Sequence, residues 1–139
     1  MGITIKGGDD FRKKLNEIIE KYPDVMDMAL DDTADAISLE AQTIVPVDTG
    51  RLRGSINVKR EYLKKTIGTN VEYARHVEYG TSPHEIVAKN KKVLANKKKG
   101  IFFGKKVNHT GSKEQPFLRP ALEKFGTTAT IVKYFKENL

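Results

Sequence analysis

The first third of the chain has apolar residues at helical spacing. This spacing predicts a first helix from about Asp9 to Tyr22, which Pro23 ends. The expected buried face of this helix consists of Phe11, Leu15, Ile18, Ile19 and Tyr22. A second helix is predicted from about Asp24 to Thr43. Its apolar stripe consists of Leu30, Ala34, Ile37, Ala41 and Ile44. Each helix is therefore expected to bury one face in a core.

Strand-like segments follow Pro46. Leu52–Glu61 and Tyr62–Thr69 are predicted to pair as antiparallel strands. Their candidate buried residues are Ile56, Val58, Tyr62 and Ile67. The alternation of Tyr73, Val77 and Tyr79 favours a further short strand over Val71–Tyr79, although this segment also tolerates a helical turn.

A last helix is predicted to open at Gln115-Pro116, with Pro120 tolerated in its first turn. Its expected apolar face consists of Phe117, Ala121, Leu122 and Phe125. Helices combined with antiparallel strands on short turns indicate an α+β fold. The expected order is two N-terminal helices, a curved antiparallel sheet with a long basic hairpin, and a C-terminal helix. The chain has 139 residues and no repeat, and it is predicted to form a single domain over residues 1–139.

The charge is divided unevenly along the chain. Residues 1–48 carry 11 acidic and five basic side chains, whereas residues 49–139 carry seven acidic and 20 basic ones. In a ring, an acidic face of one subunit could meet a basic face of the next; solvated acidic helices are the simpler alternative. Eight lysines lie within residues 89–106, interrupted by Val93-Leu94-Ala95 and Ile101-Phe102-Phe103. This pattern predicts a lysine-decorated hairpin arm.

Several classes of chemistry are disfavoured by the composition. The chain has no cysteine, no run of 18 apolar residues and no apolar stretch at its start, so we expect no disulfide, membrane span or secretory signal. His76, His84 and His109 match no zinc pattern, and no metal or other cofactor is expected. His76 and Glu78 would share a face on a strand and could form an acid–base pair. No recognisable nucleophile accompanies them, so no catalytic residue is predicted.

Three segments carry a resemblance to a known family. They are Val45–Ser55, Tyr73–Thr81 and Gln115–Leu122, which read VPVDTGRLRGS, YARHVEYGT and QPFLRPAL. In this order, behind a helical leader and with a lysine-rich loop before the third, they resemble the tail-completion family of long-tailed phages, which includes head–tail joining and minor tail proteins. The resemblance extends from about Asp9 to Leu139.

The resemblance implies a non-enzymatic structural protein of a phage or prophage. It implies subunits that assemble in the host cytoplasm into a ring, expected to be a hexamer, at the neck or the head-proximal end of the tail. The implied partners are other copies of the chain, head connector proteins, and tail tube or tail terminator proteins. DNA passing through the ring would make nonspecific contact with it, and no membrane is involved. Joining and minor tail roles share the three segments, so both remain open.

The interface candidates come from three places. The turn after the second helix offers Asp48, Arg51 and Arg53, which would contact a neighbour or simply cap a helix-to-strand connection. The basic arm offers Lys91, Lys92, Phe102 and Phe103. The last helix offers Arg119, which would pair with an acidic residue of a neighbour or of its own chain. Lys89–Gln115 is expected to become ordered when neighbouring subunits cover it.

Two anchoring roles are predicted beside these candidates. Tyr73 and Tyr79 are expected to anchor the sheet against the long helix. Gly80 is expected to let the chain turn where a side chain would clash.

Two other classes of function remain as alternatives. A small basic nucleic-acid-binding protein would use the Lys89–Lys106 loop, with Phe102 and Phe103 stacking on bases. Its DNA affinity would depend steeply on salt and be lost when the lysines become glutamine. A hydrolase would use His76 and Glu78 and would lose its activity in a His76→Ala variant.

Overall fold

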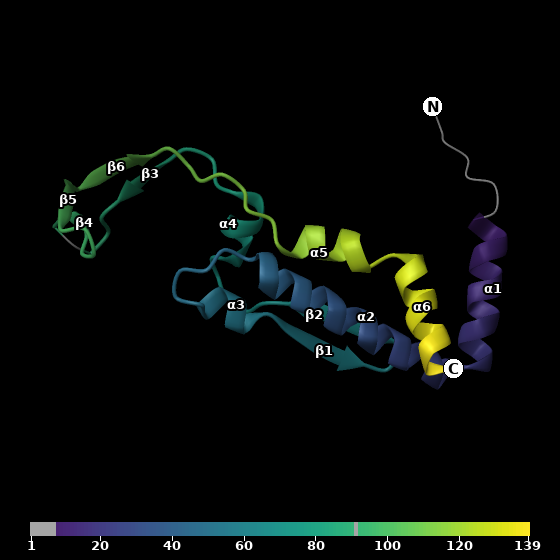
Figure 1. Cartoon of the computed structure of the whole chain (residues 1–139). Helices are drawn as coiled ribbons and strands as arrows, with labels where there is room; N and C mark the ends of the chain where they lie inside the picture. The colour runs from purple at the N-terminus through teal and green to yellow at the C-terminus, as the bar shows by residue number, and fades with distance from the viewer. Residues whose placement is uncertain (1–7, 91) are drawn as a thin grey trace, which may run out of the picture. The chain divides into compact units, whose positions relative to one another are not determined.

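The structure is a computed structural model that describes residues 8–90 and 92–139; for Gly8 and Phe11 it describes the backbone alone. The described chain divides into two units (Figure 1). The first unit contains the residues up to Asn70 together with Phe117–Leu139, and the second is Val71–Pro116. A single domain over residues 1–139 stays a prediction.

Five helices belong to the first unit: α1 (Gly8–Lys21), α2 (Pro23–Ile44), α3 (Arg51–Ser55), α5 (Leu118–Phe125) and α6 (Thr128–Asn138). The two predicted N-terminal helices are confirmed. The predicted C-terminal helix is two helices in the structure. The helix α5 ends just before Gly126, where a Cβ atom would lie 2.6 Å from the Leu122 carbonyl oxygen. Thr127 then caps α6, since its hydroxyl accepts a hydrogen bond from the Thr130 N–H at 3.3 Å.

The core of the first unit forms around α2, which packs against α5 and α6 and also against a β-hairpin (Figure 1). The hairpin pairs β1 (Asn57–Glu61) with β2 (Lys64–Gly68). The buried side chains of α2 are Met26, Ala29, Thr33, Ala34, Ile37, Ser38 and Ala41. Ala41 and Ala121 are fully buried, and their small size lets α2 and α5 approach closely. Ile44 was expected in the core but is exposed, because it is the last residue of α2.

The predicted antiparallel pairing is confirmed over Asn57–Gly68, with Ile56 buried and Val58 and Ile67 half-buried. The strand prediction for Leu52–Ser55 is wrong, because these residues form α3, whose Leu52 is buried. Tyr62 was also expected to be buried. It lies in the tight turn between β1 and β2 and is 62% exposed, because the turn extends beyond the covered face of the hairpin.

The second unit contains one short helix and four strands: α4 (Ala74–Tyr79), β3 (His84–Val87), β4 (Leu94–Asn96), β5 (Ile101–Gly104) and β6 (Lys106–His109). β3 pairs with β6 and β4 with β5, both antiparallel. The α+β class is therefore confirmed. One curved sheet was expected, but the described strands form three separate two-stranded sheets. Each of these strands is short, with at most five residues. The strand favoured over Val71–Tyr79 is a helix instead, because the segment is too short for its alternation to decide.

Candidate assembly interface

The turn between α2 and α3 presents charged side chains to solvent from a fixed backbone. Val45 and Leu52 are buried at either end of the turn. Gly50 has φ +79°, and the Thr49 hydroxyl accepts a hydrogen bond from the Arg51 N–H at 3.4 Å. The interface candidates on this turn, Asp48, Arg51 and Arg53, are all exposed. They are accessible to a partner; their role as contacts stays a prediction.

The basic arm of the second unit, residues 84–109, begins at a tight backbone junction. Thr81 and Ser112 exchange two backbone hydrogen bonds, of 3.0 and 3.1 Å, and their hydroxyls are 3.0 Å apart. Gly80 and Gly111 lie on either side of this pair. A Cβ atom on Gly80 would lie 2.5 Å from the Ser112 carbonyl oxygen, and one on Gly111 would overlap the Thr81 carbonyl oxygen. The expected role of Gly80 is thus confirmed, and these four residues form what we call the arm root.

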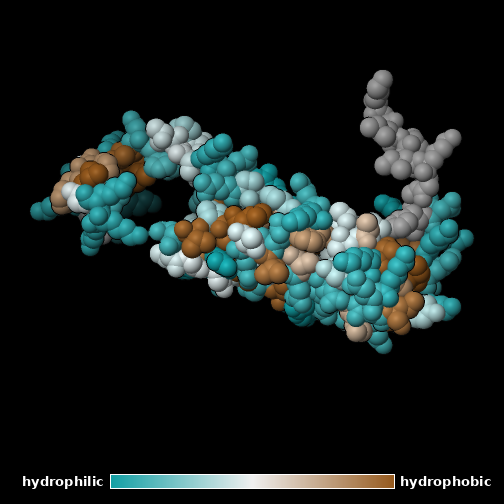
Figure 2. Space-filling model, in the orientation of Figure 1, coloured by the Kyte–Doolittle hydropathy of each residue, from teal (hydrophilic) through white to brown (hydrophobic). Residues whose placement is uncertain are grey.

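The arm beyond this root has no core of its own. None of its described residues, 84–90 and 92–109, is buried. Phe102 is 75% exposed and Phe103 48% exposed, and Lys92 is exposed as well. Lys91 lies outside the described residues. Figure 2 shows apolar residues gathered at the end of the arm among hydrophilic ones. The predicted lysine-decorated hairpin is confirmed, with Gly100 (φ +63°) and Gly104 (φ +82°) bounding β5.

The remaining predicted side chains do not form a catalytic arrangement. His76 is exposed and Glu78 is buried, because both lie on helix α4, where residues two apart point in different directions. The acid–base pair predicted for a strand is therefore wrong. Tyr73 and Tyr79 are exposed, so the prediction that they anchor a sheet is wrong as well. Arg119 is exposed in the first turn of α5.

Two of the three histidines meet on the arm. His84 and His109 are register partners of β3 and β6, and their ring centroids are 5.1 Å apart. The Gly111 N–H donates to Nδ1 of His109 at 3.0 Å, and Nδ1 of His84 lies 2.9 Å from the Ser82 carbonyl oxygen. Among the residues that the structure describes, no three His, Cys, Asp or Glu side chains are grouped to hold a metal ion.

None of the described helices is long and apolar enough to cross a membrane.

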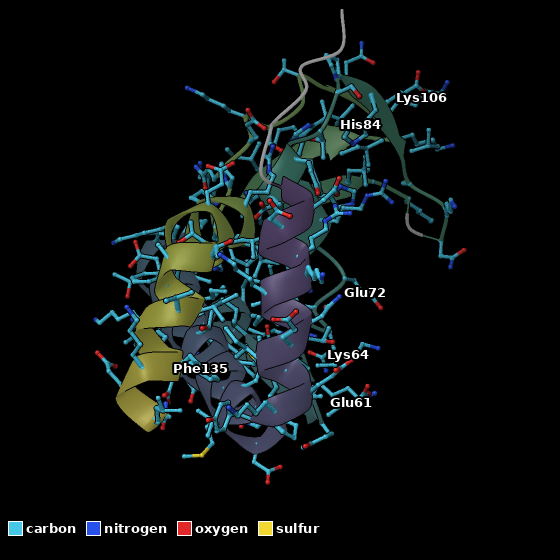
Figure 3. The ribbon with its side chains drawn as sticks, turned by 90° about the vertical axis from the view of Figure 1, so that its right-hand side faces the viewer. Glu61, Lys64, Glu72, His84, Lys106 and Phe135 are labelled. Atoms are coloured by element: carbon cyan, nitrogen blue, oxygen red, sulfur yellow. The ribbon has the colours of Figure 1, made fainter. Side chains whose placement is uncertain are left out.

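A row of carboxylates along α2 fastens the β1–β2 hairpin. The row consists of Asp24, Asp27, Asp31 and Asp35, spaced three or four residues apart. The Arg60 guanidinium donates to Asp31 at 2.6 Å and also to Asp35. Lys65 donates to Asp27 at 2.9 Å and lies 3.2 Å from Asp31, and the Tyr62 hydroxyl donates to Asp24 at 2.9 Å. Further along the hairpin, Glu61 and Lys64 lie side by side in solvent (Figure 3). Three of the 11 acidic side chains within residues 1–48, those of Asp27, Asp31 and Asp35, thus pair with basic groups of their own chain.

Sequence reasoning missed this contact, although a signal for it exists. The aspartates recur every three or four residues and so share one side of α2. Arg60, Tyr62 and Lys65 follow within one short predicted hairpin, as complementary donors.

Asp27 has a second role at the hairpin turn. Its carboxylate accepts a hydrogen bond from the Leu63 N–H at 2.6 Å. Leu63 has φ +54°, a left-handed conformation that is unfavourable for a leucine. Lys65, whose side chain is 6% exposed, and the Leu63 N–H both stabilise the ionised carboxylate and hold the pKa of Asp27 below its ordinary value of 3.8.

This geometry predicts an acid-sensitive contact. Because the folded state binds the Asp27 proton less readily than the unfolded chain, its stabilisation is complete above the ordinary pKa of 3.8. It is lost as the pH falls through the lower folded-state pKa. An Asp27→Asn variant should melt several degrees below the native protein at pH 7, and the difference should shrink at low pH. Thermal unfolding monitored by circular dichroism measures both. The control Asp9→Asn changes an exposed aspartate of α1 and should have almost no effect; a difference for Asp27→Asn that is independent of pH would contradict the prediction.

The comparison with known proteins identifies a family. The family model described as "Bacteriophage HK97-gp10, putative tail-component" matches residues 9–80. The match covers α1 and α2, the charged turn, the β1–β2 hairpin and α4, and it stops before the arm. No curated protein and no solved structure matches the chain significantly. The chain therefore belongs to the HK97-gp10-like family of bacteriophage tail components.

Proposed function

We propose that the protein is a non-enzymatic part of the phage neck that forms a ring, expected to be a hexamer, and joins or completes the tail. Its partners would be further copies of itself, head connector proteins and tail tube or tail terminator proteins. It would assemble in the host cytoplasm and remain in the virion. Membership of a family of phage tail components supports a structural role in the virion.

One observation carries the proposal that the arm is an assembly surface. The arm exposes Ile101, Phe102 and Phe103 at its end, and none of its described residues is buried. Two-stranded sheets of this size are marginally stable in water without further cover. Large apolar side chains that remain exposed in the free chain are typical of surfaces that a partner covers. The arm therefore gains most from contact with neighbours.

The mechanism that we propose is interface formation. Neighbouring subunits would supply the apolar cover and the counter-charge that the arm lacks in the free chain. The ordering of the arm would then coincide with binding, and the entropy lost in this ordering would lower the net affinity. Weak association in solution would keep rings from forming before a docking partner is present.

This mechanism predicts a monomer in solution. Native mass spectrometry of the purified protein should give the mass of one chain, and addition of its docking partner should give a ring. Hydrogen exchange of the arm should be fast in the monomer and slow in the ring. A stable, fully protected ring of the pure protein would contradict ordering on assembly.

Nonspecific contact with DNA is the second candidate. The arm carries eight lysines and no arginine. Lysines attract phosphate without the paired hydrogen bonds that arginine makes to base edges. A DNA role of this kind predicts weak, salt-dependent binding without sequence preference.

A further inference from the structure

A pocket in the second unit lies beside the arm root. It encloses about 810 Å³ and is lined from α4, from the loop that follows α4 and from the first residue of β3. Its lining includes Arg75, His76, Thr81, Ser82 and His84. None of the described lining residues is acidic. The pocket therefore suits an anion.

Several hydrogen-bond donors of this lining have no partner among the residues that the structure describes. The Arg75 guanidinium is exposed and forms neither a hydrogen bond nor an ion pair with a described residue. The His76 side chain is exposed and has no described partner either. The hydroxyl and the N–H of Ser82 donate to no described group, whereas its carbonyl oxygen lies 2.9 Å from Nδ1 of His84. These donors are available to a ligand.

The backbone that carries these donors is held in place. The Gln115 N–H donates to the Val77 carbonyl oxygen of α4 at 2.8 Å. Thr81 is held by its two backbone hydrogen bonds with Ser112, and Ser82 follows it directly. Donors that are positioned before binding lose less conformational freedom when a ligand arrives. The pocket is therefore organised for its anion in advance.

The kinds of donor indicate a phosphate group. Arginine side chains, hydroxyls and backbone N–H groups are the usual partners of phosphate oxygens in complexes with DNA. A carboxylate has two oxygens, which the fork of one guanidinium can serve, whereas a phosphate accepts further hydrogen bonds from other directions. Arg75, His76 and Ser82 are exposed, so a phosphate can reach them while it remains part of a strand.

We propose that this pocket binds a phosphate group of DNA that contacts the protein. Arg75 forms paired hydrogen bonds with the phosphate, and Ser82 donates its hydroxyl and N–H to it. Such contacts position a strand without reading its sequence. Arg75, His76 and Ser82 precede the arm, so the arm stays available to neighbouring subunits. The inference rests on the proposed nonspecific contact with DNA and gives it a site outside the lysine run.

Fluorescence anisotropy with a labelled random duplex tests the proposal on the free chain. An Arg75→Gln variant should bind the duplex about tenfold more weakly at low salt. The slope of its log affinity against log salt concentration should be smaller by about 0.9, the value for one lost phosphate contact. The control Arg12→Gln removes the same charge from an exposed position of α1 and should leave affinity and slope unchanged. An Arg75→Gln variant with the native affinity and slope would overturn the proposal and leave the contact with DNA to the lysines alone.

Amide NMR of the unaltered protein locates the contact. The Ser82 amide and the Arg75 Nε resonances should shift when the duplex is added, whereas the Leu139 amide should not. Inorganic phosphate and a polyglutamate peptide are the comparison probes. Shifts with inorganic phosphate but not with the duplex would overturn DNA as the source of the phosphate. Equal shifts with polyglutamate would overturn the proposal in favour of an acidic protein segment.

Assembly is measured separately from this contact. By native mass spectrometry, Arg75→Gln should form the ring on the docking partner as the native protein does. Loss of the ring in this variant would overturn the proposal by making Arg75 a contact between proteins. A native chain that binds the duplex through Arg75 and Ser82, yet forms no ring, would support the phosphate site and contradict the assembly role.

Discussion

A Gly111→Ala variant should open the arm root and abolish assembly. Gly111 has φ +86°, and a methyl group there would overlap the carbonyl oxygen of Thr81. Relief of this overlap requires Thr81 and Ser112 to separate, with loss of their two backbone hydrogen bonds. The arm is then no longer held at its base. Hydrogen exchange of the Thr81 and Ser112 amides should become more than about tenfold faster, and no ring should form on the docking partner.

Gly104→Ala is the matched control for this variant. Gly104 has a similar φ of +82°, but a methyl group on it would have no atom within 4 Å. It therefore carries the cost of a left-handed alanine, about 1 kcal/mol, without the overlap. Its effect should be confined to the arm near β5, and exchange at Thr81 and Ser112 should stay slow. Equal effects of the two variants would mean that backbone strain, and not the close approach at the arm root, decides the outcome.

A Phe117→Ala variant should cause the largest loss of stability in the first unit. Phe117 is 0% exposed and is the largest fully buried side chain among the described residues. It directly precedes α5, which contains the fully buried Ala121 and packs against α2. Loss of its ring leaves a cavity and should destabilise the protein by about 3–5 kcal/mol. Thermal unfolding should then occur more than about 12 °C below that of the native protein.

Leu122→Ala controls for the loss of an apolar side chain from the same helix. Leu122 is 55% exposed on α5, so its truncation removes little buried area. The variant should melt close to the native protein. A Phe117→Ala variant that is as stable as Leu122→Ala would contradict the role of Phe117 in the core.

The helices were the most predictable part of the fold, because their apolar spacing persists over several turns. Ala34, Ile37 and Ala41 were identified correctly on α2. Met26 and Ala29 were missed, because α2 packs against helices on one side and a hairpin on another and so buries a wider face than a single stripe.

The exposed tyrosines show where sequence reasoning fails. Tyr62, Tyr73 and Tyr79 are large aromatic residues of a kind that often packs in a core, yet all three are exposed. The hydropathy of a short element does not show whether one of its faces is covered by the rest of the fold. Tyr62 lies in the turn after β1, and Tyr73 and Tyr79 lie at the two ends of α4, where their side chains stay exposed to solvent. In a component of a larger assembly, such side chains are also available to a neighbour.

The arm was predictable as a hairpin but not in its detail. The glycines at 100 and 104 and the lysine run indicated a turn-rich basic segment. The pairing of His84 with His109, and the close approach of Gly111 to Thr81, depend on contacts between residues about 25 to 30 positions apart. Local patterns carry no information about such pairings, since these are fixed by register. The family match also stops before the arm, so it could not supply them.

Electron microscopy of particles from the source phage or prophage that lack this gene would show directly whether the protein joins heads to tails. We expect filled heads beside separate, complete tails, and recovery of joined particles when the native gene is supplied. The gene for Gly111→Ala should fail to restore joining, and that for Gly104→Ala should succeed. Missing or aberrant tails would move the role from joining to tail assembly. Normal, infectious virions without the protein would contradict a structural role in the virion.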